Sequence, residues 1–490
     1  MAIRTWRLFV DGKWTEAASG ATYAVPNPAT EETVALAPDA GREDMVRAVA
    51  AARRAFDSGP WRRSTPEERA RILSRIADGV EKRKEEFRAL LVAAHGAEAM
   101  THGIQLETPI AQLRGYAELA TRFAWDEPLA TVQGLTVVGM NPVKGIAHHQ
   151  PAGVCGLIPT WNFPLFVTAQ KVGPAIATGC TMVVKPSPWG PLVDLLFAEI
   201  LAECDLPPGV FNVVTGLSPE LGAELAESPL IDKISFTGSV SVGKKVALAA
   251  AGTLKRVHLE LGGKSAQLIL DDFEVDAAAP ASAAPTYFHA GQGCAMTTRV
   301  LVHRRRHDAL VEKMAAFVRA FVKVGDPADP SVILGPLIRE ERRQAVAGYV
   351  ASGREQGAEL VCGGRAPAAL PRGFFFEPTI FANVRNDMRI AREEIFGPVV
   401  SVIPFEDEED AIRIANESSL GLFGGILTQD LDKARAVAKR IRAGGVSING
   451  AVNLTHAPFG GFKESGIGRE GGIFGLREFT EIQTITWPEG

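Results

Sequence analysis

The chain of 490 residues lacks long apolar runs and lacks an excess of basic charge. No stretch approaches the roughly 18 apolar residues that a membrane-spanning helix needs, and Arg4 and Arg7 interrupt the N-terminal segment where a signal peptide would be apolar. We therefore expect a cytoplasmic protein with no membrane partner. The formal net charge of −5 offers no extended basic surface for phosphate backbones, so we do not expect a nucleic-acid partner.

Cysteine is also scarce, with five residues in the chain. An odd number without close spacing argues against a disulfide framework and against a zinc site, so we expect reduced thiols and no bound metal. A free cysteine is usually a small buried hydrophobe. We expect this of four of the five, namely Cys155, Cys180, Cys204 and Cys362.

The G-x-G-x-x-G fingerprint of dinucleotide-binding turns is absent after every strand that the sequence predicts. In its place, residues 236–243 run from a strand through a glycine turn into a helix, whose N-terminus can accept pyrophosphate oxygens. Alone, this segment is a weak indication of a cofactor site. The chain also has no internal repeat and no low-complexity segment.

Composition and local patterns predict a folded protein of several domains. Hydrophobic residues make up 46% and charged residues 22%, so neither disorder nor a fibrous repeat is expected, and the length favours about three domains. Residues 41–93 have helical apolar spacing, and residues 65–68 form a capping box that predicts a helix start. We expect the basic run 303–307 to be a solvated turn rather than an anion site.

Short apolar runs alternate with helix-length segments between residues 153 and 270. This alternation predicts a parallel, doubly wound sheet, whose ligands bind at the carboxyl ends of the strands. Asn162, Lys185, Ser239 and Glu260 fall at such ends. The strand candidates are residues 154–158, 182–184, 211–214, 231–236 and 267–270.

A second alternation follows Cys294 and predicts a second α/β unit that carries this thiol. Residues 131–149 and 480–487 are also strand-like but belong to neither alternation. The strand candidates of the second unit are residues 299–302, 375–380, 399–404 and 446–449.

Cys294 differs from the other cysteines in its setting. It follows Gly291 and Gly293, so we expect its sulfur at an open turn where backbone amides favour the thiolate. Such a thiol can attack a carbonyl carbon. A cysteine hydrolase is the competing interpretation, and it would need an imidazole beside the sulfur. His289 is the nearest candidate in the sequence.

Two other residues complete an acyl-transfer pattern in the order donor, base, nucleophile. Asn162 can donate its side-chain N–H to an oxygen that gains charge, with the backbone N–H of Cys294 as a second donor. Glu260 ends an apolar run before two glycines, where desolvation would raise its pKa toward that of a useful base. The competing interpretations are a structural asparagine in a turn and a surface glutamate that caps one.

With these motifs the chain resembles the NAD(P)-dependent aldehyde dehydrogenases of the non-acylating, hydrolytic type. The similarity runs nearly from end to end and does not depend on one motif. Its blocks, in family order, are residues 27–30, 185–187, 236–239, 259–264, 288–299, 335–337, 393–398 and 458–461.

The resemblance implies an α/β fold with a Rossmann-type cofactor domain, a second α/β catalytic domain and a β-strand oligomerisation arm. Residues 1–130 and 150–262 would form the NAD(P)-binding domain, and residues 263–472 the thiol-bearing catalytic domain. Residues 131–149 and 473–490 would form the arm. Because an exposed strand edge invites pairing with another chain, we expect a homodimer or homotetramer.

The reaction that the resemblance implies is oxidation of an aldehyde to a carboxylic acid. Cys294 would attack the aldehyde to form a thiohemiacetal, which loses hydride to NAD(P) and becomes a thioester. Glu260 would then activate the water that releases the acid. Asn162 and Lys171 complete the predicted catalytic set.

The implied cofactor is NAD. Ser239 resembles the phosphate contact, Lys185 the adenine-ribose contact and Glu394 the nicotinamide-ribose contact. Many NAD-preferring members carry glutamate where this chain has Pro188, and without that charge we expect NADP to be tolerated as well. The predicted cofactor contacts are Ile158, Pro159, Trp161, Lys185, Ser187, Pro188, Gly216, Phe236, Gly238, Ser239, Val242, Leu261, Gly262, Glu394 and Phe396.

Aromatic residues resemble the walls of an aldehyde tunnel and favour an apolar or aromatic aldehyde, although aromatics at such positions are also ordinary core residues. The predicted substrate contacts are Phe163, Gln170, Thr455 and Phe459, with Trp161, Lys171, His456 and Asn453 nearby. Two alternatives stay open. One is a CoA-acylating aldehyde dehydrogenase, against which Glu260 argues, and the other is a non-catalytic binding protein on the same fold.

Overall fold

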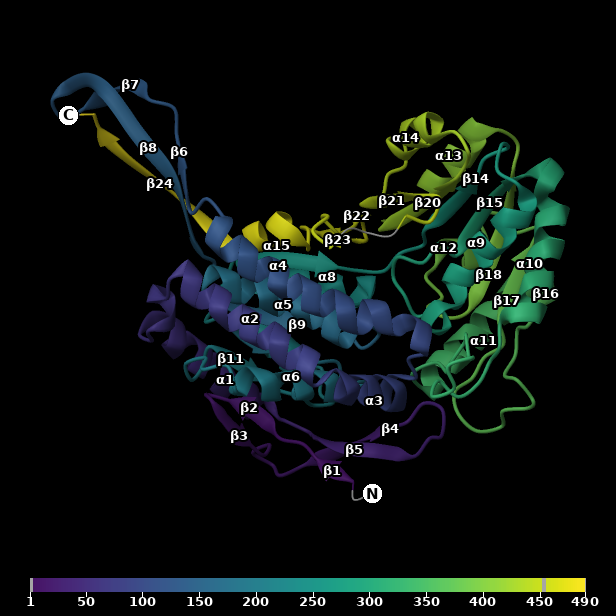
Figure 1. The fold of residues 1–490 in the computed structure, drawn as a ribbon, viewed down its shortest axis with the longest axis horizontal. Helices are drawn as coiled ribbons and strands as arrows, with labels where there is room; N and C mark the ends of the chain where they lie inside the picture. The colour runs from purple at the N-terminus through teal and green to yellow at the C-terminus, as the bar shows by residue number, and fades with distance from the viewer. Residues whose placement is uncertain (1–2, 452–454, 490) are drawn as a thin grey trace.

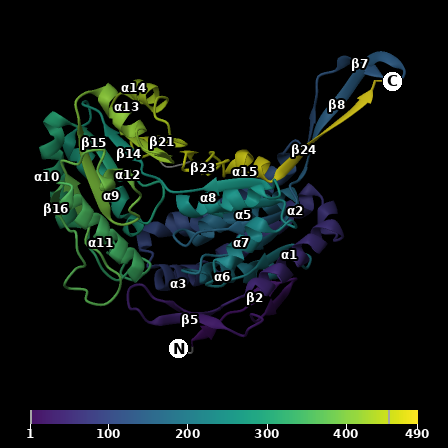
Figure 2. The ribbon, with the colours of Figure 1, turned by 180° about the vertical axis from the view of Figure 1, so that it is seen from behind.

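The computed structural model describes residues 3–451 and 455–489. Two large β-sheets, each flanked by helices, lie side by side, and a smaller β-sheet projects away from them as an arm (Figure 1). The view from behind shows the same three parts, with the arm rising from the first sheet's side of the molecule (Figure 2). The predicted fold class is confirmed.

The first sheet has eight strands in the order β23-β13-β12-β9-β10-β11-β2-β3. The neighbours from β13 to β11 pair in parallel, and the strands at the two edges pair antiparallel. The strands are β2 (Leu8–Val10), β3 (Lys13–Thr15), β9 (Val154–Ile158), β10 (Thr181–Val184), β11 (Phe211–Val213), β12 (Lys233–Thr237), β13 (Arg256–Glu260) and β23 (Gly466–Ile467).

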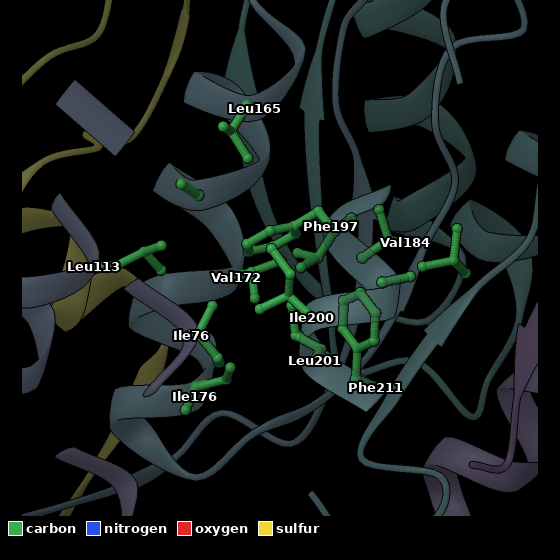
Figure 3. Packing of buried hydrophobic residues seen from close by; sticks show 14 of the residues in the cluster. Ile76, Leu113, Leu165, Val172, Ile176, Val184, Phe197, Ile200, Leu201 and Phe211 are labelled. Atoms are coloured by element: carbon green, nitrogen blue, oxygen red, sulfur yellow. The ribbon is translucent and has the colours of Figure 1, made fainter. Parts of the chain in front are cut away.

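Helices cover both faces of this sheet. Helices α5 (Pro164–Thr178) and α6 (Leu192–Ala202) pack on one face together with α2 (Pro66–Lys82), α3 (Lys84–His95) and α4 (Thr108–Arg122). Helices α1 (Arg42–Asp57), α7 (Glu220–Glu227) and α8 (Val240–Ala251) pack on the other. Figure 3 shows the core of the first face, where buried side chains of α2, α4, α5 and α6 meet those of β10 and β11.

The predicted capping box starts α2. Thr65 Oγ1 accepts a hydrogen bond from the backbone N–H of Glu68, and the Glu68 carboxylate accepts one from the backbone N–H of Thr65. Pro66 occupies the first helical position, where a missing N–H costs no hydrogen bond. The predicted helical segment 41–93 is thus confirmed as α1, α2 and α3.

The second sheet has seven strands in the order β16-β17-β18-β15-β14-β20-β21, parallel except for the β16–β17 pair. Its strands are β14 (Ala266–Ile269), β15 (Arg299–His303), β16 (Glu359–Cys362), β17 (Thr379–Ala382), β18 (Val399–Phe405), β20 (Phe423–Leu427) and β21 (Gly445–Ile448). Its helices are α9 (Val275–Tyr287), α10 (His307–Phe321), α11 (Glu340–Glu355), α12 (Arg389–Arg392), α13 (Glu408–Asn416) and α14 (Leu431–Ala438).

Two strand predictions need correction. The run 267–270 was expected in the first sheet, but β14 lies in the second. Only residues 261–265 separate it from β13, and a parallel crossover within one sheet needs about a dozen residues or more. The run 375–380 was expected as a strand, but β17 begins at Thr379, because Pro378 cannot donate to a ladder.

Other small features agree with or refine the expectations. The basic run forms a short 3-10 helix (Arg304–Arg306) between β15 and α10, with Arg304 and Arg305 exposed. Cys155, Cys180 and Cys204 are buried as expected, but Cys362 is half-buried because it ends an edge strand. The remaining strands are β1 (Arg4–Thr5), β4 (Thr22–Pro26), β5 (Thr33–Pro38), β19 (Leu420–Gly421) and β22 (Phe462–Lys463).

The arm is an antiparallel sheet of β6 (Asp126–Pro128), β7 (Val132–Thr136), β8 (Gly139–Pro151) and β24 (Thr480–Pro488), and α15 (Gly472–Glu478) leads into it. The strands expected at 131–149 and 480–487 are confirmed. Apolar side chains are exposed near the tip, with 84% of Leu135 and 79% of Val138 accessible. Among the described residues, no helix is long and apolar enough to span a bilayer.

Candidate active site

The predicted catalytic and cofactor residues of the first sheet follow the carboxyl ends of adjacent parallel strands. Asn162 follows β9, Lys185 directly follows β10, Ser239 follows β12, and Glu260 is the last residue of β13. Because these strands are neighbours and parallel, their carboxyl ends lie along one edge of the sheet. The fold therefore gathers side chains that are up to about a hundred positions apart in sequence.

Cys294 reaches this edge on a turn that precedes β15. His289, Ala290 and Gly291 have φ angles of 50°, 52° and 73°, so the backbone is left-handed just before the thiol. A Cβ on Gly291 would lie 2.2 Å from the carbonyl oxygen of Gly397, and one on Gly263 would lie 2.2 Å from that of Cys294. Glycine at these positions lets the thiol segment pack directly against Gly397 and against the turn that follows Glu260.

Asn162 is tied to the same segment. Its Nδ2 donates a hydrogen bond of 2.8 Å to the carbonyl oxygen of Gln292, two residues before Cys294. The side chain is 3% exposed, and Oδ1 has no hydrogen-bond partner among the described residues. One N–H of the amide is thus used for positioning, and the other is left for a ligand.

The surroundings of Cys294 disfavour its thiolate. Burial raises its pKa, and the carboxylates of Glu260 and Glu394 raise it further. Backbone N–H groups of Cys294 and Ala295 lower the pKa, but by less. The sequence left the resting ionisation of Cys294 open. The backbone amides act in the expected direction, but desolvation and two nearby carboxylates outweigh them.

Glu260 is 3% exposed, and neither carboxylate oxygen has a hydrogen-bond partner among the described residues. Burial raises its pKa well above the usual value, and Glu470 adds to this effect, whereas Lys171 and Arg469 oppose it. The predicted desolvation is confirmed, and a surface glutamate that caps a turn is excluded. A carboxylate with a raised pKa and free oxygens has the properties of a general base.

Lys171 forms a buried ion pair with Glu470. Its Nζ donates to Glu470 Oε1 at 2.7 Å and to Ser235 Oγ at 2.9 Å, with both the lysine and glutamate side chains buried. The sequence reasoning missed Glu470, although a carboxylate between Arg469 and two glycines, soon after the block 458–461, was an available signal. This buried pair lies within electrostatic range of Glu260.

The predicted phosphate contact caps a helix. Ser239 is the N-cap of α8, and its Oγ accepts a hydrogen bond of 3.4 Å from the backbone N–H of Val242. Both side chains are exposed, and Gly238 precedes them in the turn after β12. Lys185 is 7% exposed, and within the part of the chain that the structure describes its Nζ donates only to the carbonyl oxygen of Pro186, at 3.2 Å. Burial lowers the pKa of Lys185 to about 8.

Glu394 reaches back to the glycine turn after β13. Its Oε1 accepts a hydrogen bond of 2.9 Å from the N–H of Gly263, and a Cβ on Gly262 would lie 2.3 Å from Oε2. Burial raises the pKa of Glu394 to about 7. Phe396 has a φ of 55°, and its ring lies edge-on to Trp161 with centroids 5.4 Å apart.

The other predicted cofactor residues differ in exposure. Ser187 and Pro188 are half-buried in the loop after β10, and Gly216 lies beyond β11, where a Cβ would come within 2.9 Å of the Ala40 carbonyl oxygen. The buried members of the set are Ile158, Pro159, Phe236, Leu261 and Gly262.

Phe163 belongs to an aromatic cluster beside the thiol segment. Its ring stacks on Phe288 with centroids 6.3 Å apart and lies 6.5 Å from Phe166. Gln170 is 4% exposed, and Phe459 is half-buried and pairs through its backbone with Glu470. Thr455 is half-buried, and His456 is exposed with its imidazole against Gly115 of α4. Asn453 lies outside the described residues.

His289 does not complete a cysteine-hydrolase pair. Neither ring nitrogen has a hydrogen-bond partner among the described residues, and the ring lies 5.2 Å from that of Phe163. The thiol therefore lacks the adjacent imidazole that such an enzyme needs. Within the described ranges, no cluster of three or more His, Cys, Asp or Glu side chains is placed to hold a metal ion.

Comparison with known proteins supports the family resemblance. The profile of the aldehyde dehydrogenase family matches residues 14–485. A 3-succinoylsemialdehyde-pyridine dehydrogenase of a Pseudomonas species is 40% identical over 492 residues, which cover 100% of this chain and 100% of that protein.

Solved structures are equally similar. The aldehyde dehydrogenase of Mycobacterium tuberculosis complexed with NAD+ is 42% identical, with a TM-score of 0.93 over 100% of this chain and 99% of that one. A mutant of aldehyde dehydrogenase C from Pseudomonas syringae, complexed with NAD+ and octanal, is 40% identical, with a TM-score of 0.92 over 98% and 96% of the two chains. The chain belongs to the aldehyde dehydrogenase family.

Proposed function

We propose that the protein oxidises an aldehyde to its carboxylic acid, with Cys294 as the nucleophile and NAD as the hydride acceptor. The observation that carries this proposal is the convergence of Cys294, Asn162 and Glu260, which the hydrogen bond from Asn162 to Gln292 and the close contact of Gly263 with Cys294 bring about. The NAD+ in the solved relatives from Mycobacterium tuberculosis and Pseudomonas syringae supports the choice of acceptor.

The residues present fit a dinucleotide. The N-terminus of α8, capped by the exposed Ser239, offers backbone N–H groups to a pyrophosphate. Lys185 has donor capacity to spare for a ribose hydroxyl, and Glu394 is an acceptor for a second ribose. When bound, NAD accepts a hydride. Trp161 and Phe396, whose rings lie edge-on to each other, would also contact the cofactor.

The proposed reaction begins with bond formation between Cys294 Sγ and the carbonyl carbon of the aldehyde. The thiol proton passes to solvent, and the oxygen that gains charge accepts N–H from Asn162 and from the backbone of Cys294. After hydride leaves the thiohemiacetal, a thioester remains on Cys294. The Glu260 carboxylate takes a proton from water as the water oxygen attacks the thioester carbon. The Cys294–carbon bond breaks, the leaving Sγ takes the proton from Glu260, and the acid is released.

We propose an apolar or aromatic aldehyde as the substrate. The stacked rings of Phe163 and Phe288 lie next to the thiol segment, and Gln170 and Phe459 are further contacts in this proposal. The octanal in the Pseudomonas syringae complex is an apolar aldehyde and is consistent with this class.

Purified protein mixed with NAD and a panel of aliphatic and aromatic aldehydes tests the proposal. We expect steady formation of reduced NAD that is fastest with apolar aldehydes. Turnover only after addition of CoA would indicate the acylating subtype. If no aldehyde leads to reduction of NAD, the protein is a non-catalytic binding protein on this fold.

NADP is expected to support measurable turnover because Pro188 replaces a carboxylate that would repel the 2′-phosphate. Comparing kcat/KM for the two cofactors checks this. Pro188→Glu should lower kcat/KM with NADP by about tenfold or more and leave that with NAD nearly unchanged. Complete inactivity of the wild type with NADP would contradict the prediction.

We propose that residues 131–149 and 473–490 form an oligomerisation arm on a body of two domains, residues 1–130 with 150–262 and residues 263–472. The arm has a free strand edge and exposed apolar side chains near its tip. Replacing both Leu135 and Val138 by Asp should therefore convert a homodimer or homotetramer to smaller species in light scattering. Phe321→Asp is the matched control, because Phe321 is 67% exposed but lies on α10, away from the arm. A wild type that is already monomeric would refute the arm's role.

A further inference from the structure

A second cluster of buried ionisable side chains lies behind the turn that carries Cys294. Glu98, in the segment after α3, and His95, at the end of α3, are both 0% exposed, and His289 is 1% exposed. None of the three has a place in the proposed reaction. Buried carboxyl and imidazole groups are costly unless they are paired, so their presence here calls for a physical reason.

The polar atoms of this cluster are only partly satisfied. Glu98 Oε1 accepts a hydrogen bond from the N–H of Gly335, and His95 Nδ1 lies 2.8 Å from the carbonyl oxygen of Trp161. Glu98 Oε2 and both nitrogens of His289 have no hydrogen-bond partner within residues 3–451 and 455–489. Glu98 Oε2 and His289 Nδ1 are 3.9 Å apart. A buried polar atom without a hydrogen bond costs free energy, and a closer contact between Glu98 Oε2 and His289 Nδ1 would reduce that cost for both atoms.

The cluster connects directly to the thiol segment and to its amide donor. The side chain of Gln292 donates to the carbonyl oxygen of His289 at 3.2 Å and accepts from the N–H of Ile338 at 2.9 Å. The carbonyl oxygen of Gln292 accepts from Asn162 Nδ2 at 2.8 Å. A displacement of His289 would therefore move the group that aligns Asn162 with Cys294.

The backbone at this point needs an external restraint. His289 and Ala290 are both left-handed, with φ angles of 50° and 52°, and side chains with a Cβ rarely adopt that conformation. Such residues persist where the surrounding structure over-determines them. The imidazole is held between the Phe163 ring, 5.2 Å away, and the Glu98 carboxyl group.

We propose that the buried Glu98 carboxyl group and His289 imidazole, which lie 3.9 Å apart, act together as a positioning device that holds the left-handed turn so that Cys294 lies correctly against Asn162. This inference rests on the proposed function. The pair connects the end of α3, the block at Gly335 and the thiol turn, three segments that are distant in sequence. Neither residue touches the reacting atoms in this scheme, so both are positioning residues.

The protonation states are compatible with such a pair. Burial raises the pKa of Glu98 to about 7. Burial, with a smaller contribution from His95, lowers the pKa of His289 to about 3. A protonated Glu98 can donate its O–H to a neutral His289, so the pair needs no net charge in the core.

Two pairs of variants test the proposal. Glu98→Leu and His289→Leu remove the polar contact between the two side chains and keep apolar volume, and each should lower kcat by about tenfold with KM for NAD nearly unchanged. Glu98→Gln and His289→Asn keep a donor and an acceptor, and asparagine tolerates a positive φ, so both should retain nearly full kcat. His307→Asn is the matched control, because His307 is 3% exposed but lies on α10.

A readout that does not need turnover separates failure of this inference from failure of the proposed function. The rate at which iodoacetamide alkylates Cys294, measured by mass spectrometry without cofactor, should change by about fivefold or more in the leucine variants and stay constant in the conservative ones. If the wild type oxidises no aldehyde, this rate still reports whether the pair positions the thiol.

A double-mutant cycle shows whether Glu98 acts on kcat through the alignment of Asn162. In an Asn162→Ala background, Glu98→Leu should cost much less than the about tenfold expected in the wild type, because the alignment is already lost. Folded leucine variants with unchanged kcat and alkylation rate would overturn the proposal. The same holds if their melting temperature falls while kcat and the alkylation rate stay unchanged. If Glu98→Leu does not fold, His289→Leu and the two conservative variants carry the same test.

Discussion

Cys294→Ser is expected to lower kcat for aldehyde oxidation by at least about 10⁴-fold, as removal of an enzyme's nucleophile usually does. A serine hydroxyl ionises far less readily than a thiol and is a weaker nucleophile, and among the described residues the His289 imidazole of the same turn makes no hydrogen bond that could activate it. The measurement is the steady-state rate of NAD reduction with the best aldehyde of the panel. NAD binding and the melting temperature should be unchanged, because the two side chains are nearly isosteric.

Cys362→Ser is the matched control for this experiment. Cys362 is the other half-buried cysteine, but it ends an edge strand of the second sheet and belongs to no proposed site. Its replacement should leave kcat unchanged. If the Cys294→Ser enzyme keeps activity within about tenfold of the wild type, Cys294 is not the nucleophile.

Glu260→Gln is expected to lower steady-state kcat by about 10²–10⁴-fold, the usual contribution of a general base. The amide cannot take a proton from water, so the thioester on Cys294 should accumulate. Rapid mixing should then show a burst of at most one reduced NAD per subunit, followed by very slow turnover. A small nucleophilic amine such as hydroxylamine should release the acyl group and restore turnover in Glu260→Gln but not in Cys294→Ser.

The pH dependence of kcat gives the same experiment a second readout. Only the carboxylate form of Glu260 is a base, and burial and the charge of Glu470 raise its pKa well above the usual value. Activity of the wild type should therefore rise with pH through a range well above the ordinary glutamate pKa of about 4.3. This limb should be absent in Glu260→Gln and kept in Glu406→Gln, which alters an exposed glutamate. Wild-type turnover by Glu260→Gln would show that another group activates the water.

Much of the fold could be predicted because the local signals agree with one another. The strand at 154–158 has the predicted bounds, and the capping box at 65–68 starts a helix where expected. The errors arose where local pattern does not determine sheet membership. The apolar run at 267–270 has the same composition in either sheet, and only the short connection after Glu260 places β14 in the second.

The sequence by itself determined the family and the α/β class, and it proposes the set of reacting groups, because a nucleophile, a base and an amide donor are recognisable from residue type and motif order. Tertiary structure alone decided how these groups are held and ionised. Desolvation raises the pKa values of Cys294 and Glu260, and the charges that add to this effect come from distant segments, such as Glu394 and Glu470. The pairing of Glu98 with His289, 191 positions apart, likewise follows from packing, because no local pattern encodes a contact between two such distant segments.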